Sequence, residues 1–540
     1  MSKLPLTEEQ EKILEEQENC VVVASPGSGK TFIISRKIQQ ILTDLPGYKG
    51  VIAISFTNKA SNELERRCLS SGANRKGSYF GTIDSFFITE IIIPFGTHVF
   101  GIPQNEIQVI KLDDFEDPEE YDHLRDLRPL QTVRGDVVDD ITALFVNGVI
   151  VLETVGFLAL YIFDISRSCR RYLKARYSYI FIDEYQDCDR WQHQLFIKLA
   201  RLGLISWAVG DVNQSIFAFA NKDSRYLMSM TQDGRFTTYP LTVNHRCHTS
   251  IANYSARLLT KDFIPNQTDD IRVLHKHIDG CEIDIAEWLS EAIPRMADHY
   301  QVEHPNKIAI LVKNWRTNDL IHQNLSIPHK PVIPTPLDED SSLWGSVLRK
   351  ILYVIFSPEL TKHELVEKYL HTAYQQRAAR SVLKTLSEIE AVANQGPYLL
   401  QAHLPLFVDV ATKIFPQAQN QLAINNLRQV LENNDLLNSF IPAQEEEVQL
   451  MTLHKAKGLE FEIVYHLNLY RWIFPQYRGD RIQKLQDLNL HYVGVTRAKS
   501  CCVLCTSSER HNWHEEIIQA EPSEFLARNG VEELRINCEF

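Results

Sequence analysis

The chain has 540 residues, of which 44% are hydrophobic and 23% are charged, and its formal net charge is −13. This length and composition predict a multidomain globular protein with about three or four domains. The acidic balance argues against a surface that is basic all over, although it leaves room for a local basic channel.

The N-terminal residues lack the apolar run of a secretory signal, and ten cysteines without such a signal indicate reduced thiols. We therefore expect a cytoplasmic protein. The most apolar stretch, VIVLETVGFLALYIF at 149–163, is too short to span a membrane and contains Glu153. We interpret it as a buried helix and expect no membrane contact.

Apolar runs typical of buried strands recur along the chain and mostly alternate with helical patterns. This order predicts an α/β fold with parallel sheets, with enough strands for two. The runs lie at 20–24, 50–56, 178–183, 204–210, 307–312, 462–467 and 501–506. Two long stretches, 87–175 and 345–440, carry no phosphate chemistry and are predicted to be mainly helical insertions.

The first apolar run leads into a glycine-rich loop that is followed by an amphipathic pattern. Gly27 and Gly29 would let backbone N–H groups turn toward phosphates, Lys30 would reach the β and γ phosphates, and the Thr31 hydroxyl could ligate Mg²⁺. The first glycine of the usual pattern is replaced by Ala24. We predict that a nucleoside triphosphate binds here through Ser25, Pro26, Gly27, Ser28, Gly29, Lys30 and Thr31.

A second part of the nucleotide site is predicted at YIFIDEYQD, residues 179–187. The apolar run leads directly into two carboxylates, at the end of a strand where ligands of α/β sheets bind. Asp183 could hold Mg²⁺ through water, and Glu184 could orient and deprotonate the attacking water. Adjacent carboxylates are common on plain surfaces, but their pairing with the phosphate loop favours hydrolysis.

Two other patterns have simpler structural interpretations. Cys501, Cys502 and Cys505 lie close together, but no second Cys/His pair follows at ligand spacing, so a buried strand is favoured over a metal site. The basic stretch SRSCRRYLKAR at 166–176 is more often a solvated helix face than a phosphate track.

Ten motifs follow one another between residue 6 and residue 499. They are LTEEQ, ASPGSGKT, SFTNKASNELERR, GTIDSF, DEYQD, VGDVNQSIFAF, LTVNHR, IAILVKN, MTLHKAKGLEFEIV and HYVGVTRAK. Their order resembles that of UvrD/Rep-type superfamily 1 helicases. Within that group, the stretch GTIDSFFITEIIIPF, with Asp84 where most relatives have histidine, and the compact insertions resemble the helicase component of the Gabija anti-phage defence system.

The resemblance implies two RecA-like P-loop domains with ATP between them. Domain 1A would comprise 1–86 and 176–235, and domain 2A would comprise 236–344 and 441–540. The helical insertions would be domain 1B at 87–175 and a reduced domain 2B at 345–440.

The resemblance also implies a role for particular residues around the nucleotide. Gln10 would read adenine through an amide that both donates and accepts. Gln214 would sense the γ-phosphate, and Arg246 and Arg497 would act as arginine fingers from the second domain.

Further contacts to the nucleotide and to DNA are implied in the same way. His245 would stack on the base in place of the usual tyrosine, Gly458 would touch the γ-phosphate, and Glu460 would bind the ribose. Phe56 would offer a stacking face to single-stranded DNA, although a core position at the strand end is its simpler interpretation. The other implied DNA contacts are Asn58, Lys59, Thr82, Phe219, Thr452 and His454.

The chain departs from the family pattern in the segment that couples ATP to the bases. The family's SIYxWRGA is SIFAFANK here, so Phe217, Phe219, Ala220 and Asn221 replace Tyr, Trp, Arg and Gly. These changes could weaken DNA stimulation or strand separation without touching hydrolysis. Lys313 also stands where relatives often carry arginine.

The resemblance implies an Mg²⁺- and ATP-dependent 3′–5′ translocase or helicase that is stimulated by single-stranded DNA and works with an OLD-family nuclease, the partner component of the Gabija system. Two alternatives remain open. One is a nucleotide-gated protein that senses DNA ends or nucleotides and switches a partner without unwinding, which the altered 217–221 segment favours. The other is a DNA repair helicase unrelated to defence. The intact Glu184, Arg246 and Arg497 favour turnover.

Overall fold

The computed structural model describes most of residues 6–540. The residues outside the description are 57, 70, 71, 73, 106, 113, 114, 116, 117, 126, 128–134, 212–224, 341, 357–360, 371–375, 417, 418 and 477–480, together with 1–5. The chain divides into two compact units, each built from separate stretches of sequence. Unit 1 comprises Met1–Phe86, Arg167–Pro331 and Ala443–Phe540, and unit 2 comprises Phe87–Ser166 and Val332–Pro442.

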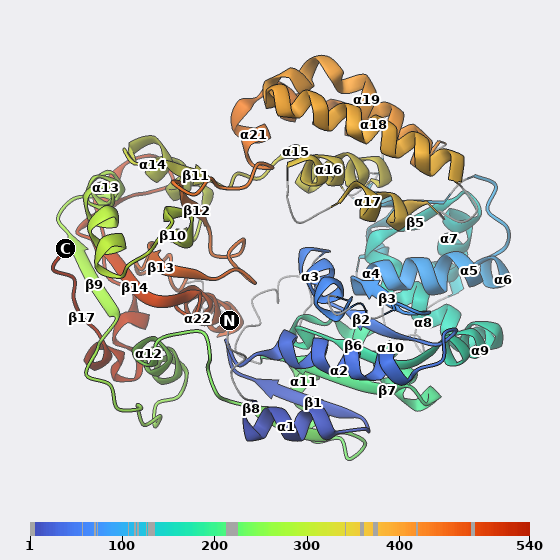
Figure 1. The fold of residues 1–540 in the computed structure, drawn as a ribbon, viewed down its shortest axis with the longest axis horizontal. Helices are drawn as coiled ribbons and strands as arrows, with labels where there is room; N and C mark the ends of the chain where they lie inside the picture. Colours follow the sequence, from blue (N-terminus) through green and yellow to red (C-terminus); the bar gives the residue numbers. More distant parts are fainter. Residues whose placement is uncertain are drawn as a thin grey trace. The chain divides into compact units, whose positions relative to one another are not determined.

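Unit 1 contains a first parallel sheet whose strands, over the described residues, run in the order β3-β2-β6-β7-β1-β8 (Figure 1). The strands are β1 (Cys20–Ala24), β2 (Gly50–Ile54), β3 (Tyr79–Gly81), β6 (Tyr177–Ile182), β7 (Ile205–Gly210) and β8 (Thr237–Leu241). Because all of them run parallel, the loops that follow them gather at one edge of the sheet.

The helices connected with this sheet bury apolar faces against it. They are α1 (Glu8–Glu15), α2 (Lys30–Asp44), α3 (Asn58–Leu69), α4 (Ile83–Phe86), α9 (Arg167–Arg176), α10 (Arg190–Leu202) and α11 (Arg225–Thr231). Ile34 and Ile38 of α2 pack with Val22, Val51 and Trp207 in a fully buried core. In α9 only Cys169 and Leu173 are buried, so its basic residues form a solvated face.

Unit 1 also contains a second parallel sheet, with the described strands in the order β11-β12-β10-β13-β14-β9-β17. They are β9 (Val273–Ile278), β10 (Ile308–Val312), β11 (His329–Pro331), β12 (Val448–Thr452), β13 (Phe461–His466), β14 (Ala498–Ser507) and β17 (Ile536–Asn537). Cys501, Cys502 and Cys505 lie fully buried in β14, which confirms the strand interpretation of this cysteine cluster.

The second sheet has its own helices and a small hairpin. The helical segments are α12 (Thr249–Leu259), α13 (Glu282–His299), η9 (Pro305–Lys307), α14 (Trp315–Asn324), α22 (Arg481–Val495) and η11 (Glu524–Leu534), and the hairpin is β15 (Glu509–His511) with β16 (Ile517–Gln519). The α/β class with two parallel sheets is thus the fold that the strand runs predict.

Unit 2 is mainly helical, as the long stretches without phosphate motifs predict. Its part from 87 to 166 contains the π-helix η1 (Phe87–Ile92), α5 (Ile93–Phe95), α6 (Thr97–Phe100), β4 (Gln108–Ile110), η3 (Pro118–Leu124), α7 (Gly135–Val146), β5 (Val149–Val151), η5 (Leu152–Thr154) and α8 (Val155–Ile165). The apolar stretch at 149–163 therefore begins as a short strand paired with β4 and becomes a buried helix only from Val155.

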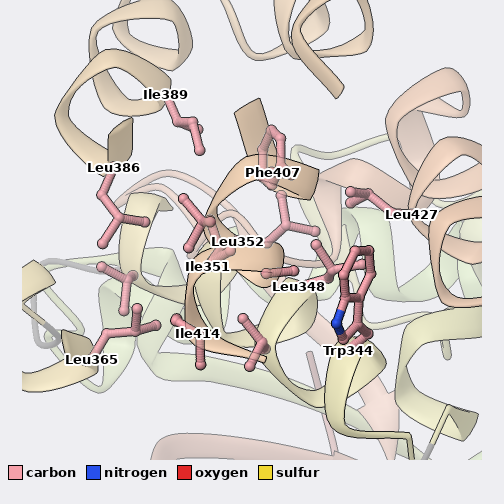
Figure 2. Close-up of a cluster of buried hydrophobic side chains, with 14 of the residues drawn as sticks. Trp344, Leu348, Ile351, Leu352, Leu365, Leu386, Ile389, Phe407, Ile414 and Leu427 are labelled. Atoms are coloured by element: carbon pink, nitrogen blue, oxygen red, sulfur yellow. The ribbon is translucent and has the colours of Figure 1, made fainter. Parts of the chain in front are cut away.

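The rest of unit 2 consists of packed helices. They are α15 (Pro336–Glu339), α16 (Leu343–Phe356), α17 (Lys362–Tyr369), α18 (Gln376–Gln395), η10 (Pro397–His403), α19 (Leu404–Ile414), α20 (Gln421–Glu432) and α21 (Asn434–Asn438). Figure 2 shows their core, in which Leu348, Leu386 and Phe407 from three helices meet. Trp344 is buried there and its indole Nε1 donates to the Phe415 carbonyl at 3.0 Å.

Within the part of the chain that the structure describes, every helix is too short or too polar to cross a membrane. The division into domains 1A, 1B, 2A and 2B remains a prediction.

Candidate nucleotide and catalytic site

The glycine-rich loop connects β1 to the first turn of α2. Gly27 and Gly29 have φ values of 67° and 87°, which glycine adopts without strain. The loop closes on itself because the Ser28 hydroxyl donates to the Ser25 carbonyl at 2.7 Å. α2 begins at Lys30, so its positive dipole end and free N–H groups point to the loop. This geometry suits a bound phosphate.

Thr31 and Asp183 come together although they are 152 residues apart. The Thr31 Oγ1 donates to Asp183 Oδ2 at 2.9 Å, and Asp183 Oδ1 accepts from the Glu184 amide at 2.9 Å. Burial and the adjacent Glu184 charge raise the pKa of the Asp183 carboxyl. A hydroxyl beside a carboxylate is a donor set that Mg²⁺ accepts, and a cation here would offset the cost of this buried charge.

Glu184 is held by the turn that follows β6. Its φ and ψ of 58° and 41° lie in the left-handed region, which is uncommon for a residue other than glycine. Its Oε2 accepts from Gln186 Nε2 at 2.5 Å. Burial alone would raise the pKa of Glu184, but the charges of Lys30 and Lys457 outweigh it and lower the pKa. The carboxylate is therefore ionised at neutral pH and able to accept a proton.

Gln10 lies against the phosphate loop. α1 begins with a capping box in which Thr7 and Gln10 exchange side-chain and backbone hydrogen bonds. The same glutamine is buried, and its Nε2 donates to the Ser28 carbonyl at 3.3 Å. The residue implied to read adenine is thus coupled directly to the loop.

The segment that leads from β8 to α12 also contacts the loop. The His245 amide donates to the Gly27 carbonyl at 2.9 Å. Asn244 Oδ1 accepts from the amides of Arg246 and Cys247 at 2.8 and 2.9 Å, which sets the turn. A side chain on Gly27 would meet Arg246 Cβ at 2.5 Å, so this arginine lies directly beside the loop.

Arg246 and Glu460 bind each other. The Arg246 Nε donates to Glu460 Oε2 at 2.7 Å, and Lys499 lies 3.3 Å from the other carboxylate oxygen. Partial burial would raise the pKa of Glu460, but the charges of Arg246 and Lys499 lower it. Glu460 follows the turn that contains Gly458, which has a φ of 88°.

Arg497 is 2% exposed and follows α22 of the second sheet. Its Nε and Nη1 donate to the carbonyls of Val493 and Leu459, both at 3.2 Å. Burial and the neighbouring Arg246 lower its pKa to about 10, while Glu184 has the opposite effect. Arg497 therefore stays cationic at neutral pH, close to groups from both sheets.

The residues expected to bind DNA are placed only in part. Phe56 follows β2 and is half-buried, Thr82 precedes α4, and His454 is exposed, whereas Thr452 is 4% exposed at the end of β12. Asn58 and Lys59 begin α3, but their side chains lie outside the described part. Gln214, Phe217, Phe219, Ala220 and Asn221 also lie outside the described residues.

Lys313 has its own partners in the second sheet. Its Nζ lies 2.5 Å from Asp487 Oδ1, donates to the Ile473 carbonyl and sits 4.4 Å from the centre of the Phe474 ring. Burial lowers the pKa of this ammonium group, while Asp487 opposes that change. These contacts give Lys313 a packing role.

Two parallel sheets, a glycine-rich loop and acidic groups at a strand end define a P-loop nucleoside triphosphatase. The sequence matches two family models, the AAA domain over residues 9–220 and the UvrD-like helicase C-terminal domain over residues 348–509. Through these matches the chain is similar to the UvrD-like helicases of superfamily 1.

Curated relatives cover nearly the whole chain at modest identity. The Gabija protein GajB of Bacillus cereus (strain VD045) is 26% identical over 95% of this chain and 97% of that protein. A probable DNA helicase II homolog of Rickettsia conorii is 24% identical over 96% of this chain and 95% of its own. The ATP-dependent DNA helicase PcrA of Bacillus subtilis is 21% identical over 91% of this chain and 81% of its own length.

Sequence reasoning overlooked several residues that support the site. Gln186 bonds the Glu184 carboxylate and accepts from the Asp211 amide at 2.9 Å. Asn244 organises the segment beside the loop. Gln186 and Asn244 both lie within the motifs DEYQD and LTVNHR. A polar amide at each of these positions could have predicted a supporting hydrogen bond.

Proposed function

We propose that this chain is an Mg²⁺- and ATP-dependent 3′–5′ DNA translocase or helicase that is stimulated by single-stranded DNA. The observation that carries the proposal is that charged side chains from both sheets lie around the phosphate loop. Lys30, Asp183 and Glu184 come from the first sheet. Arg246 comes from the segment that connects the two sheets, and Arg497 comes from the second sheet. The similarity to UvrD-like helicases supports ATP-dependent action on DNA. The polarity and the DNA stimulation belong to the proposal.

Hydrolysis would use the residues in separate roles. Thr31 and Asp183 would hold Mg²⁺, which when bound neutralises charge on the phosphates. The ionised Glu184 would accept a proton from the attacking water. Arg246 would exchange its partner Glu460 for the nucleotide and, with Arg497, spread the charge of the transferring phosphoryl group.

Motion would follow because the groups that contact one nucleotide belong to two sheets. Binding and release of the nucleotide would change the relative position of the two sheets. Single-stranded DNA would then be bound alternately by the residues of one sheet and of the other. Phe56 would stack on a base, which predicts little sequence preference.

The biological setting we propose is anti-phage defence together with an OLD-family nuclease. The similarity to the Gabija protein GajB over nearly the full length of both chains supports this setting. The relatives named as DNA helicases support a repair role as the alternative, and identification of co-purified partners would separate the two.

The test is steady-state ATP hydrolysis by the full chain with and without single-stranded DNA, at low and moderate salt. The wild type should be stimulated by DNA, more strongly at low salt because phosphate contacts weaken as salt rises. The Glu184→Gln variant should lose about 10²- to 10⁴-fold in turnover because it lacks the general base, while it still binds ATP. Normal turnover in that variant would refute the assignment of Glu184.

A second candidate function is a nucleotide-gated protein that switches a partner without moving along DNA. The replacement of the usual SIYxWRGA by SIFAFANK favours it. Hydrolysis that depends on Glu184 but is indifferent to DNA would support this candidate over the motor.

A further inference from the structure

A buried ion pair joins the two sheets of unit 1. Lys457 lies in the turn after β12 of the second sheet, and Asp187 ends the short helix η6 (Tyr185–Asp187) that follows β6 of the first sheet. The Lys457 Nζ is 2.5 Å from Asp187 Oδ2, across 270 residues of sequence. The two side chains are 10% and 0% exposed, so water screens the pair little.

The same ammonium group contacts the ring that we propose for DNA stacking. Lys457 Nζ lies 5.9 Å from the centre of the Phe56 ring, within the range of a cation–π interaction. Phe56 follows β2, and β2 pairs with β6. Lys457 therefore contacts the ends of two neighbouring strands of the opposite sheet, one through an aromatic face and the other through a carboxylate.

Asp187 in turn is part of the turn that holds Glu184. The Asp187 amide donates to the Glu184 carbonyl at 3.0 Å and closes a tight turn around the left-handed Glu184. A shift of Asp187 would therefore be passed to Glu184 through three residues of ordered backbone. The positive charge of Lys457 also acts directly on the Glu184 carboxylate, which supports the same connection.

We propose that Lys457 is a positioning residue that couples DNA binding to ATP hydrolysis. A nucleobase stacked on Phe56 competes for the ring face that the ammonium group contacts. Loss of the ring contact then shifts the Lys457 ammonium group relative to Asp187, and that ion pair bears on the turn that positions Glu184 for proton transfer. This inference rests on the proposed motor function, because it needs DNA to reach Phe56.

The test compares DNA-stimulated with basal ATP hydrolysis in the full chain, with oligo(dT) as the single-stranded DNA. In Lys457→Met the ratio of stimulated to basal turnover should fall toward one, while Lys457→Arg, which keeps the charge, should retain part of the stimulation. Asp187→Asn should show the same loss, and the double variant should lose no more than either single variant, because both act through one contact.

Lys313→Met is the matched control, since it removes a second lysine that pairs with an aspartate beside a ring. Its ratio of stimulated to basal turnover should stay that of the wild type. Thermal melting checks that each variant is folded, and if Lys457→Met does not fold, Lys457→Arg and Asp187→Asn give the answer.

The possible failures can be told apart. A wild type that DNA does not stimulate would overturn the proposed motor function and this inference with it. A stimulated wild type whose ratio survives unchanged in Lys457→Met, or falls equally in Lys313→Met, would overturn the role of Lys457 alone.

Discussion

Two lysine–aspartate pairs in unit 1 share the same local chemistry but join different parts of the molecule. Lys313 and Lys457 both approach an aspartate to 2.5 Å and both lie beside an aromatic ring. Asp487, the partner of Lys313, is on α22 of the same sheet, whereas Asp187 belongs to the opposite sheet. One pair therefore stabilises a single layer, and the other links two layers.

The surroundings of the two pairs agree with this difference. Asp487 also accepts from the Gln476 amide at 2.7 Å, so its charge is met by more than one donor within the second sheet. Asp187 lies at the end of the turn that contains Glu184. The contacts of Lys313 are thus those of a packing residue, whereas Lys457 is the lysine for which we propose a role in coupling.

The largest effect that would test this comparison is on stability. Lys313→Met should lower the free energy of unfolding by about 3 to 5 kcal/mol, because it leaves Asp487 buried without its cation. If the sheets separate as the proposed motor function requires, Lys457→Met should cost less, since Asp187 can then regain water. Urea unfolding followed by circular dichroism measures both variants.

A compensating change serves as the control for that prediction. Replacing both members, in Lys313→Met with Asp487→Leu, should recover most of the lost stability, because no charge is then left buried. Equal losses in Lys313→Met and Lys457→Met would contradict the distinction between the pairs.

A smaller effect concerns pH, and it also arises inside the second sheet. His466 donates from Nδ1 to the Leu467 carbonyl, and its Nε2 accepts from His491 Nδ1, both at 3.0 Å. Burial lowers the pKa of His466 to about 4, and burial with the charges of His466 and Arg535 lowers that of His491. Both imidazoles are therefore neutral in the folded protein, with Phe474 and Phe525 against them.

The sign of the pH effect follows from these lowered pKa values. The unfolded chain takes up protons below pH 6.5, whereas the folded chain does so only near pH 4, so stability falls as the pH drops through that window. For His466 the loss amounts to about 3 kcal/mol at most. Melting temperatures at pH 7 and pH 5 should differ less in His466→Gln than in the wild type, and an unchanged difference would contradict this.

The smallest effect is expected from an exposed pair. Glu291 and Arg295 on α13 lie 3.0 Å apart at i and i+4, with exposed fractions of 74% and 59%. Arg295→Gln should change the free energy of unfolding by less than about 0.5 kcal/mol, because solvent screens such pairs. If Arg295→Gln lowered the free energy of unfolding as much as Lys313→Met does, burial would not determine how much these ion pairs contribute to stability.

Much of the fold could be predicted because buried parallel strands are continuous apolar runs. All seven predicted runs coincide with strands. β8 and β9 escaped notice because polar residues interrupt them: β8 contains Pro240 and is largely exposed at the sheet edge, and β9 has His275, Lys276 and His277 in sequence next to the short β17. Strands at or near an edge tolerate such residues.

The phosphate loop could be predicted because its chemistry lies in one short segment. The neighbourhood of Lys457 could not, since its partners are far away in the sequence, Asp187 by 270 residues, and only the pairing of β2 with β6 brings Phe56 and Asp187 close together. The roles of Arg246 and Arg497 remain predictions from the resemblance, although both arginines lie near Glu184 or the loop.

Gly27 is a position where the chain has no room for a side chain. An added Cβ would lie 2.5 Å from Arg246 Cβ and 2.7 Å from Asn244 Oδ1. The side chain of an alanine at this position would push the segment that contains Asn244 and Arg246 away from the loop. The positive φ would also strain the alanine backbone. The glycine thus permits more than phosphate binding: it leaves the space in which Arg246 packs directly against the loop.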